Sequence, residues 1–80
     1  MNRDSLLTDL DQANRHLVQD RVHIECQREI VARLKWVGFA QDVARAEQLL
    51  GLFEQIQTAH VADRERILAA LGKLAGGTSD

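Results

Sequence analysis

The sequence contains no proline and no tyrosine, and it has only one cysteine, one tryptophan and two phenylalanines among its 80 residues. A single cysteine, Cys26, excludes an internal disulfide framework. Because proline is absent and the first glycine is Gly38, no helix breaker interrupts the chain before that point. A chain of 80 residues with so few aromatic side chains makes at most one small domain. Its length is near the limit at which a single core barely offsets conformational entropy.

The sequence also lacks a cluster of positive charge and a long apolar run. Its formal net charge is -2, with Lys and Arg spread among Asp and Glu, whereas surfaces that bind nucleic acid are strongly basic. No run approaches the roughly 18 apolar residues of a membrane span, and no leader peptide with a small-residue cleavage site is evident. We therefore expect a soluble cytoplasmic protein that binds neither nucleic acid nor a membrane.

A heptad pattern occupies the first half of the chain. Apolar residues recur in steps of four and three, and only Asp20 and Gln27 interrupt the line. This spacing predicts a helix over residues 5–37, with Asp4 or Ser5 as the cap that accepts a hydrogen bond from the first turn. The apolar line consists of Leu6, Leu10, Ala13, Leu17, Ile24, Val31 and Leu34.

A second heptad pattern follows the segment GFAQD. This segment predicts a turn at residues 38–42, in which Gly38 closes the first helix and Asp42 caps a second helix over residues 43–71. The last residues, 76–80, predict a disordered tail. In this second line His60 and Asp63 are the two polar interruptions. The full line is Ala46, Leu49, Phe53, Ile56, His60, Asp63, Ile67, Ala70 and Leu74.

Two long helices joined by a short turn form an antiparallel hairpin, so residues 1–75 are predicted to be a single all-α, coiled-coil-like domain. Counting outward from the turn pairs residues whose numbers sum to about 80. This register places Asp20 level with His60, and Leu17 level with Asp63. The polar interruptions of the two helices therefore fall at the same level.

The hairpin has more apolar residues than one seam between two helices can bury. Such a surplus usually marks an interaction surface. Self-association of two hairpins into a four-helix bundle, with two-fold symmetry, is the simplest way to cover it. The residues predicted to form this homodimer interface are Leu7, Ile30, Val37, Leu50, Leu52, Leu68 and Leu71.

A polar layer is predicted where the interruptions coincide. On a helix, residues three or four apart share a face, so His16 lies near Asp20, and His60 lies near Asp63 and Arg64. The favoured interpretation is structural: imidazole N–H groups donate to carboxylates, and any slip of register would set a charge against leucine.

Other interpretations of this layer remain open. His16, Asp20, His60 and Asp63 offer nitrogen and oxygen ligands for a metal ion, although no E-x2-H or H-E-x2-H motif is present. A catalytic role would use an Asp-oriented His as a general base, but no Ser or Cys nucleophile is placed beside it. A ligand-binding or pH-sensing role also remains. We expect no enzymatic activity and no cofactor.

Two segments carry a resemblance to a known group of proteins. They are ANRHLVQDRVHI in the first helix and LLGLFEQIQTAHVADRERIL in the second. In these segments the chain resembles small uncharacterised helical-hairpin proteins of rhizobia and related alphaproteobacteria. The resemblance covers most of residues 6–68 and implies a hairpin, but it implies no function because the group has no assigned activity. The chain departs from the group at Asn14, where Asp is usual, and in a longer turn that contains Phe39. The matching residues are Ala13, Arg15, His16, Gly38, Asp42, Leu49, Leu50, Phe53, His60 and Arg64.

These patterns together predict a non-enzymatic oligomerisation or protein–protein interaction module. Its expected partner is a second copy of itself, or an amphipathic helix of another protein that replaces the second copy. A metal-binding helical bundle that uses the same His and Asp residues is the alternative.

Overall fold

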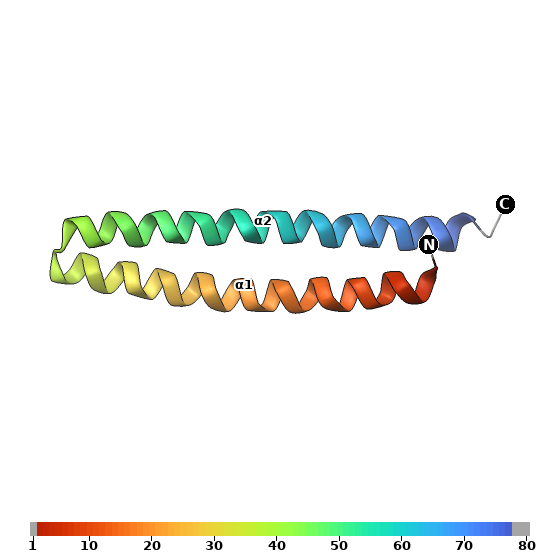
Figure 1. The fold of residues 1–80 in the computed structure, drawn as a ribbon, viewed down its shortest axis with the longest axis horizontal. Helices are drawn as coiled ribbons and strands as arrows, with labels where there is room; N and C mark the ends of the chain where they lie inside the picture. Colours follow the sequence, from red (N-terminus) through yellow and green to blue (C-terminus); the bar gives the residue numbers. More distant parts are fainter. Residues whose placement is uncertain (1, 78–80) are drawn as a thin grey trace.

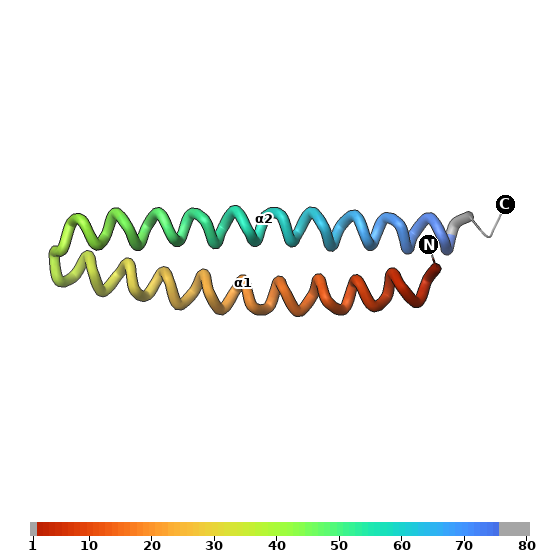
Figure 2. Tube along the Cα trace, in the orientation of Figure 1, coloured from red at the N-terminus to blue at the C-terminus, as the bar shows by residue number. Residues whose placement is uncertain are grey.

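The structure, a computed structural model, describes residues 2–77, and these residues form two α-helices and no strand. Helix α1 spans Arg3–Val37 and helix α2 spans Ala40–Gly77. The two helices lie side by side along their lengths, and the start of α1 lies beside the last turns of α2, opposite the connection (Figure 1). Figure 2 shows an uninterrupted coil through each helix. The predicted all-α helical hairpin is confirmed.

Helix α1 begins two residues earlier than the expected position 5. Its cap is Asn2, whose Oδ1 accepts a hydrogen bond of 2.7 Å from the backbone N–H of Ser5. Asp4, one of the two expected caps, instead lies in the first turn, where its charge favours the positive end of the helix dipole. Asn at the cap satisfies one of the free N–H groups of the first turn as well as Asp or Ser would.

The connection between the helices is only two residues long, shorter than the expected turn at 38–42. Gly38 adopts a left-handed conformation (φ 91°, ψ 20°), and its N–H donates to the carbonyl of Leu34 at 2.9 Å. The carbonyl of Phe39 then accepts the first hydrogen bond of α2, from Val43 at 2.9 Å. Because a left-handed glycine ends one helix and redirects the chain at once, α2 starts at Ala40 and Asp42 falls in its first turn.

Helix α2 extends beyond residue 71, which was its expected end. Gly72 lies within the helix, and the run of Leu, Ala and Lys around it continues to favour helical backbone. The expected disordered tail at 76–80 therefore overlaps the last two helical residues, and residues 78–80 lie outside the described part of the chain.

The seam of α1 matches the predicted line, whereas that of α2 differs from it. In α2 the covered positions include a line in steps of three and four, which shares Ala46, Phe53, His60 and Ile67 with the predicted line. Two further members of the predicted line, Asp63 and Ala70, are half-buried beside it. The predicted members Leu49 and Ile56 are 41% and 46% exposed and lie at the edge. Because apolar residues are adjacent in the sequence here, as at Leu49 and Leu50, hydropathy alone is compatible with both lines. The observed line is Val43, Ala46, Leu50, Phe53, Gln57, His60, Arg64, Ile67 and Leu71.

The core of the hairpin is thin. Only six apolar residues of the described chain are buried, and no large side chain among the described residues is fully enclosed. The molecule is a rod of 63 × 15 × 14 Å with a radius of gyration of 18.2 Å, whereas a compact domain of this length would have a radius of gyration of about 12 Å. The buried apolar residues are Leu6, Ala13, Ile24, Val31, Ala46 and Ile67.

The conformation of Gly38 leads to a first prediction. Substitution Gly38→Ala should lower the free energy of unfolding by about 1 kcal/mol, because a Cβ disfavours the left-handed conformation even though no atom lies within 4 Å of it. The matched control is Gly51→Ala, which lies within α2 in equally open space. It should raise the free energy by up to about 1 kcal/mol. Urea unfolding at one protein concentration measures both, and equal effects of the two substitutions would contradict the prediction.

Candidate functional site

The centre of the hairpin contains a part-buried polar contact across the two helices. Asp20 lies in the seam of α1 and is only 7% exposed. His60, half-buried on α2, approaches it, with 2.6 Å between His60 Nδ1 and Asp20 Oδ2. A carboxylate only accepts, so Nδ1–H is the donor and the ring is held in one orientation. This contact has the register expected from the sequence, in which the two residue numbers sum to 80.

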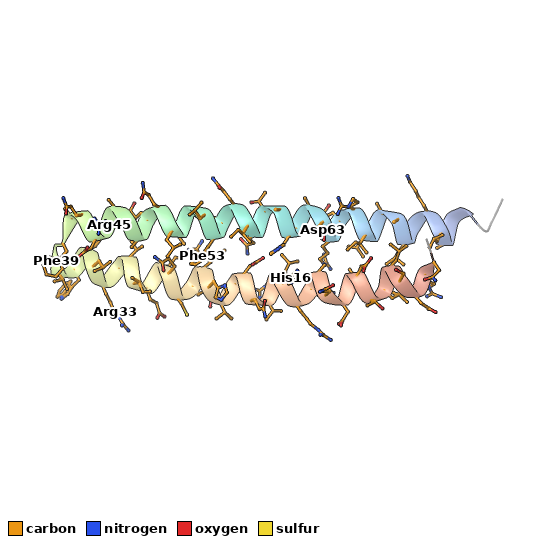
Figure 3. All side chains as sticks on the ribbon, in the orientation of Figure 1. His16, Arg33, Phe39, Arg45, Phe53 and Asp63 are labelled. Atoms are coloured by element: carbon orange, nitrogen blue, oxygen red, sulfur yellow. The ribbon has the colours of Figure 1, made fainter. Side chains whose placement is uncertain are left out.

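His16 lies one helical turn before Asp20 and packs on the same imidazole. The rings of His16 and His60 are stacked, with centroids 4.9 Å apart and planes inclined by 27°. His16 is half-buried and faces α2, as Figure 3 shows, while Arg33 on the same helix points away from α2. Three of the five residues predicted to form the polar layer, His16, Asp20 and His60, therefore meet at one level.

The fourth residue, Asp63, binds elsewhere. Its Oδ1 accepts a hydrogen bond from Arg66, one turn further along α2, rather than from His60. Arg64, expected at the edge of the layer, occupies the seam and reaches across to α1, where its Nε donates to Asn14 Oδ1 at 2.7 Å. Arg64 and Arg66 therefore bind groups other than Asp20 and His60.

A second buried polar contact lies nearer the connection. Gln27 is 5% exposed, and its Nε2 donates to the carbonyl of Ala46 at 2.9 Å. The sequence showed Gln27 as an interruption but gave no partner for it, because the acceptor is a backbone carbonyl and not a side chain. In the described part of the chain, no buried side-chain nitrogen or oxygen lacks a hydrogen-bond partner. The polar interruptions of α1 are therefore fully satisfied within the hairpin.

A groove of about 400 Å³ opens beside this layer, toward the ends of the chain. Ala13 and Ala70 are among its lining residues, and their small side chains leave the space open. Its wall is also formed by charged and polar residues from both helices, which include His16 and Asp63. The other polar residues that line the groove are Asp9, Gln12 and Arg66.

In residues 2–77 no group of three or more His, Cys, Asp or Glu side chains is placed to hold a metal ion. Cys26 is exposed, and the Thr58 hydroxyl is exposed and donates to the carbonyl of Glu54 on its own helix. Asp20 and His60 contact each other across the two helices, as the structural interpretation of the polar layer expects.

The residues predicted to form an interface fall into two groups. Leu50 and Leu71 are half-buried within the hairpin, and Leu71 packs against the core cluster of Leu6, Ala13 and Ile67. The others are exposed in the single chain: Leu7, Ile30, Val37, Leu52 and Leu68.

Comparison with known proteins adds no further constraint. No family model matches the chain, and neither a curated protein nor a solved structure is significantly similar to it. The resemblance to rhizobial hairpin proteins therefore stays a prediction. Among the described residues, neither helix combines the length and the apolar character that crossing a membrane requires.

The pairing of Asp20 with His60 leads to a second prediction. Substitution His60→Leu should lower the free energy of unfolding by about 1–3 kcal/mol, because it leaves a buried carboxylate without its donor. The double variant Asp20→Leu/His60→Leu should recover most of this loss, because it removes both polar groups together. Urea unfolding of the wild type, both single variants and the double variant measures the coupling.

The matched control is Asp11→Ala, which removes the exposed ion pair with Arg15 (2.7 Å) on α1. This change should alter the free energy by less than about 0.5 kcal/mol. Additive effects of the Asp20 and His60 substitutions would contradict the assignment of a coupled, register-fixing pair.

Proposed function

We propose that this chain is a non-enzymatic oligomerisation module, in which two hairpins associate as a homodimeric four-helix bundle. Burial of apolar side chains between the copies would drive association. The Asp20–His60 pair would fix the alignment of the two helices, so that each hairpin presents one defined surface to its partner. An amphipathic helix from another protein could occupy the same surface in place of the second copy.

The observation that carries this proposal is the amount of apolar surface that one hairpin leaves in contact with water. Thirteen large apolar side chains of the described residues are exposed, against six apolar residues buried. A hydrophobic surface of this extent is typical of proteins that associate. The exposed set is Leu7, Val18, Val22, Ile30, Trp36, Val37, Phe39, Leu49, Leu52, Ile56, Val61, Leu68 and Leu74.

The total surface area supports the same conclusion. The chain of 9.0 kDa has an accessible surface of 6228 Å², whereas a folded monomer of this mass typically exposes about 4,900 Å². The difference, roughly 1,300 Å², exceeds the roughly 800 Å² that each partner buries in a standard interface. One hairpin therefore has enough surplus surface to form a stable dimer.

Sedimentation equilibrium of the full chain at micromolar concentrations tests the proposal, because this measurement does not depend on molecular shape. We expect a mass twice that of the 9.0 kDa chain. A monomer throughout the micromolar range would contradict self-association, and the exposed apolar residues would then need a different partner.

A metal-binding bundle is the alternative that the stacked His16 and His60 rings keep open, since a second copy could bring further ligands to them. On the proposed function, purified protein should retain no stoichiometric Zn²⁺ after dialysis, and added Zn²⁺ should not change its mass or melting temperature. Metal analysis by mass spectrometry tests this. Retention of one or more equivalents that is lost in His16→Ala, but not in the control His23→Ala, would favour the metal-binding alternative.

A further inference from the structure

We propose that the second copy docks on one particular edge of the hairpin and runs parallel to the first copy, with both connections at the same end. This inference rests on the proposed function and adds the surface and the orientation to it. The surface, named here the His16 edge, consists of residues at seven-residue intervals on each helix: Asp9, His16, His23, Ile30 and Val37 on α1, and Asp42, Leu49, Ile56, Asp63 and Ala70 on α2.

Several contacts show that these residues share one edge. Residues seven apart lie on the same side of a coiled-coil helix. His16 stacks on His60, and His23 lies against Phe53 with ring centroids 5.6 Å apart, so this line of α1 borders α2. The groove that His16 and Asp63 line together places the corresponding line of α2 beside it.

The opposite edge is closed by charge near the connection. There Arg28 pairs with Glu54 and Lys35 with Glu47, each at 3.6 Å. These residues directly follow seam positions, whereas the members of the His16 edge directly precede them. The opposite edge carries an apolar patch near the chain ends, formed by Leu7, Val61 and Leu68. Leu7 and Leu68 were predicted from the sequence to lie in the interface, and the present proposal places them outside it.

Polarity along the His16 edge is uneven, and this decides the orientation. The half nearer the connection carries the large apolar residues of the edge: Ile30, Leu49 and Ile56 are 44%, 41% and 46% exposed. His23 lies beside them, and Asp42 lies at the end of this half, in the first turn of α2. The half nearer the chain ends contains the groove with its polar residues. If the two-fold axis runs along the rod, the apolar half of each copy packs on the apolar half of the other copy, and the two rods overlap over their full length. If the axis runs across the rod, the leucine and isoleucine residues of one copy face the charged residues of the other, unless the copies shift along the rod and lose contact area.

Charge complementarity in the polar half also favours the parallel arrangement. A two-fold axis along the rod places α1 of one copy over α2 of the other at the same level. His16 then faces Asp63 of the second copy, and Asp9 comes level with the segment that holds Arg66 and Ala70. Opposite or hydrogen-bonding groups therefore meet at both levels, which gives the interface its specificity.

The surface is tested by two matched double variants of exposed residues. Leu49→Gln/Ile56→Gln removes apolar groups from the His16 edge, and Leu7→Gln/Leu68→Gln removes a similar pair from the opposite edge. Gln preserves helix propensity, which circular dichroism can verify. We expect the first variant to raise the dimer dissociation constant at least tenfold, and the second to change it less than threefold. The reverse order of effects would overturn the assignment of the edge.

The orientation is tested by distance measurement between spin labels. Gln41, exposed in the first turn of α2, is replaced by cysteine in a Cys26→Ala background, and the label pair in the dimer is measured by pulsed dipolar EPR. Because packed helices lie about 10 Å apart, parallel hairpins should give a separation below about 35 Å. A separation approaching the 63 Å length of the rod would overturn the parallel arrangement while leaving dimerisation itself intact. A monomer in this experiment would instead contradict the proposed function as well.

Discussion

The rest of the structure depends on one constraint: the carboxylate of Asp20, buried in the seam of α1, must keep its bond to His60 on the facing helix. A shift of one heptad would move the imidazole about 10 Å along the rod and leave a buried charge unpaired. Gln27 favours the same alignment of the helices nearer the connection, because its side-chain amide donates a hydrogen bond to the backbone of α2. Both polar contacts thus favour one alignment of the two helices across a thin seam.

A fixed alignment matters because the hairpin stabilises itself only in part. Among the residues that the structure describes, six apolar residues are buried, and the rod shape leaves many large apolar side chains exposed. With the register set, those edges become distinct: one carries the ion pairs of Arg28 and Lys35, the other a line of Ile and Leu that continues into a polar groove. Self-association through the second edge would use the surface that folding leaves uncovered.

The sequence predicted the helices and their register well because proline is absent and the heptad line of α1 is nearly unbroken. It did not predict the short connection, since a left-handed Gly38 can end one helix and begin the next within two residues. Nor did it separate Leu49 from Leu50, because adjacent apolar residues fit two seams equally. The bond of Asp63 to Arg66 was also missed, since a neighbour on the same helix competes with the partner across the seam.

A crystal structure of the purified oligomer tests the central claim most directly, because it reports the surface that the second copy covers. Our account predicts a parallel pair of hairpins with Ile30, Leu49 and Ile56 of both copies buried between them, and with His16 of each copy facing Asp63 of the other. A structure in which these three apolar residues remain exposed to solvent, while Leu7 and Leu68 are buried between copies, would contradict it.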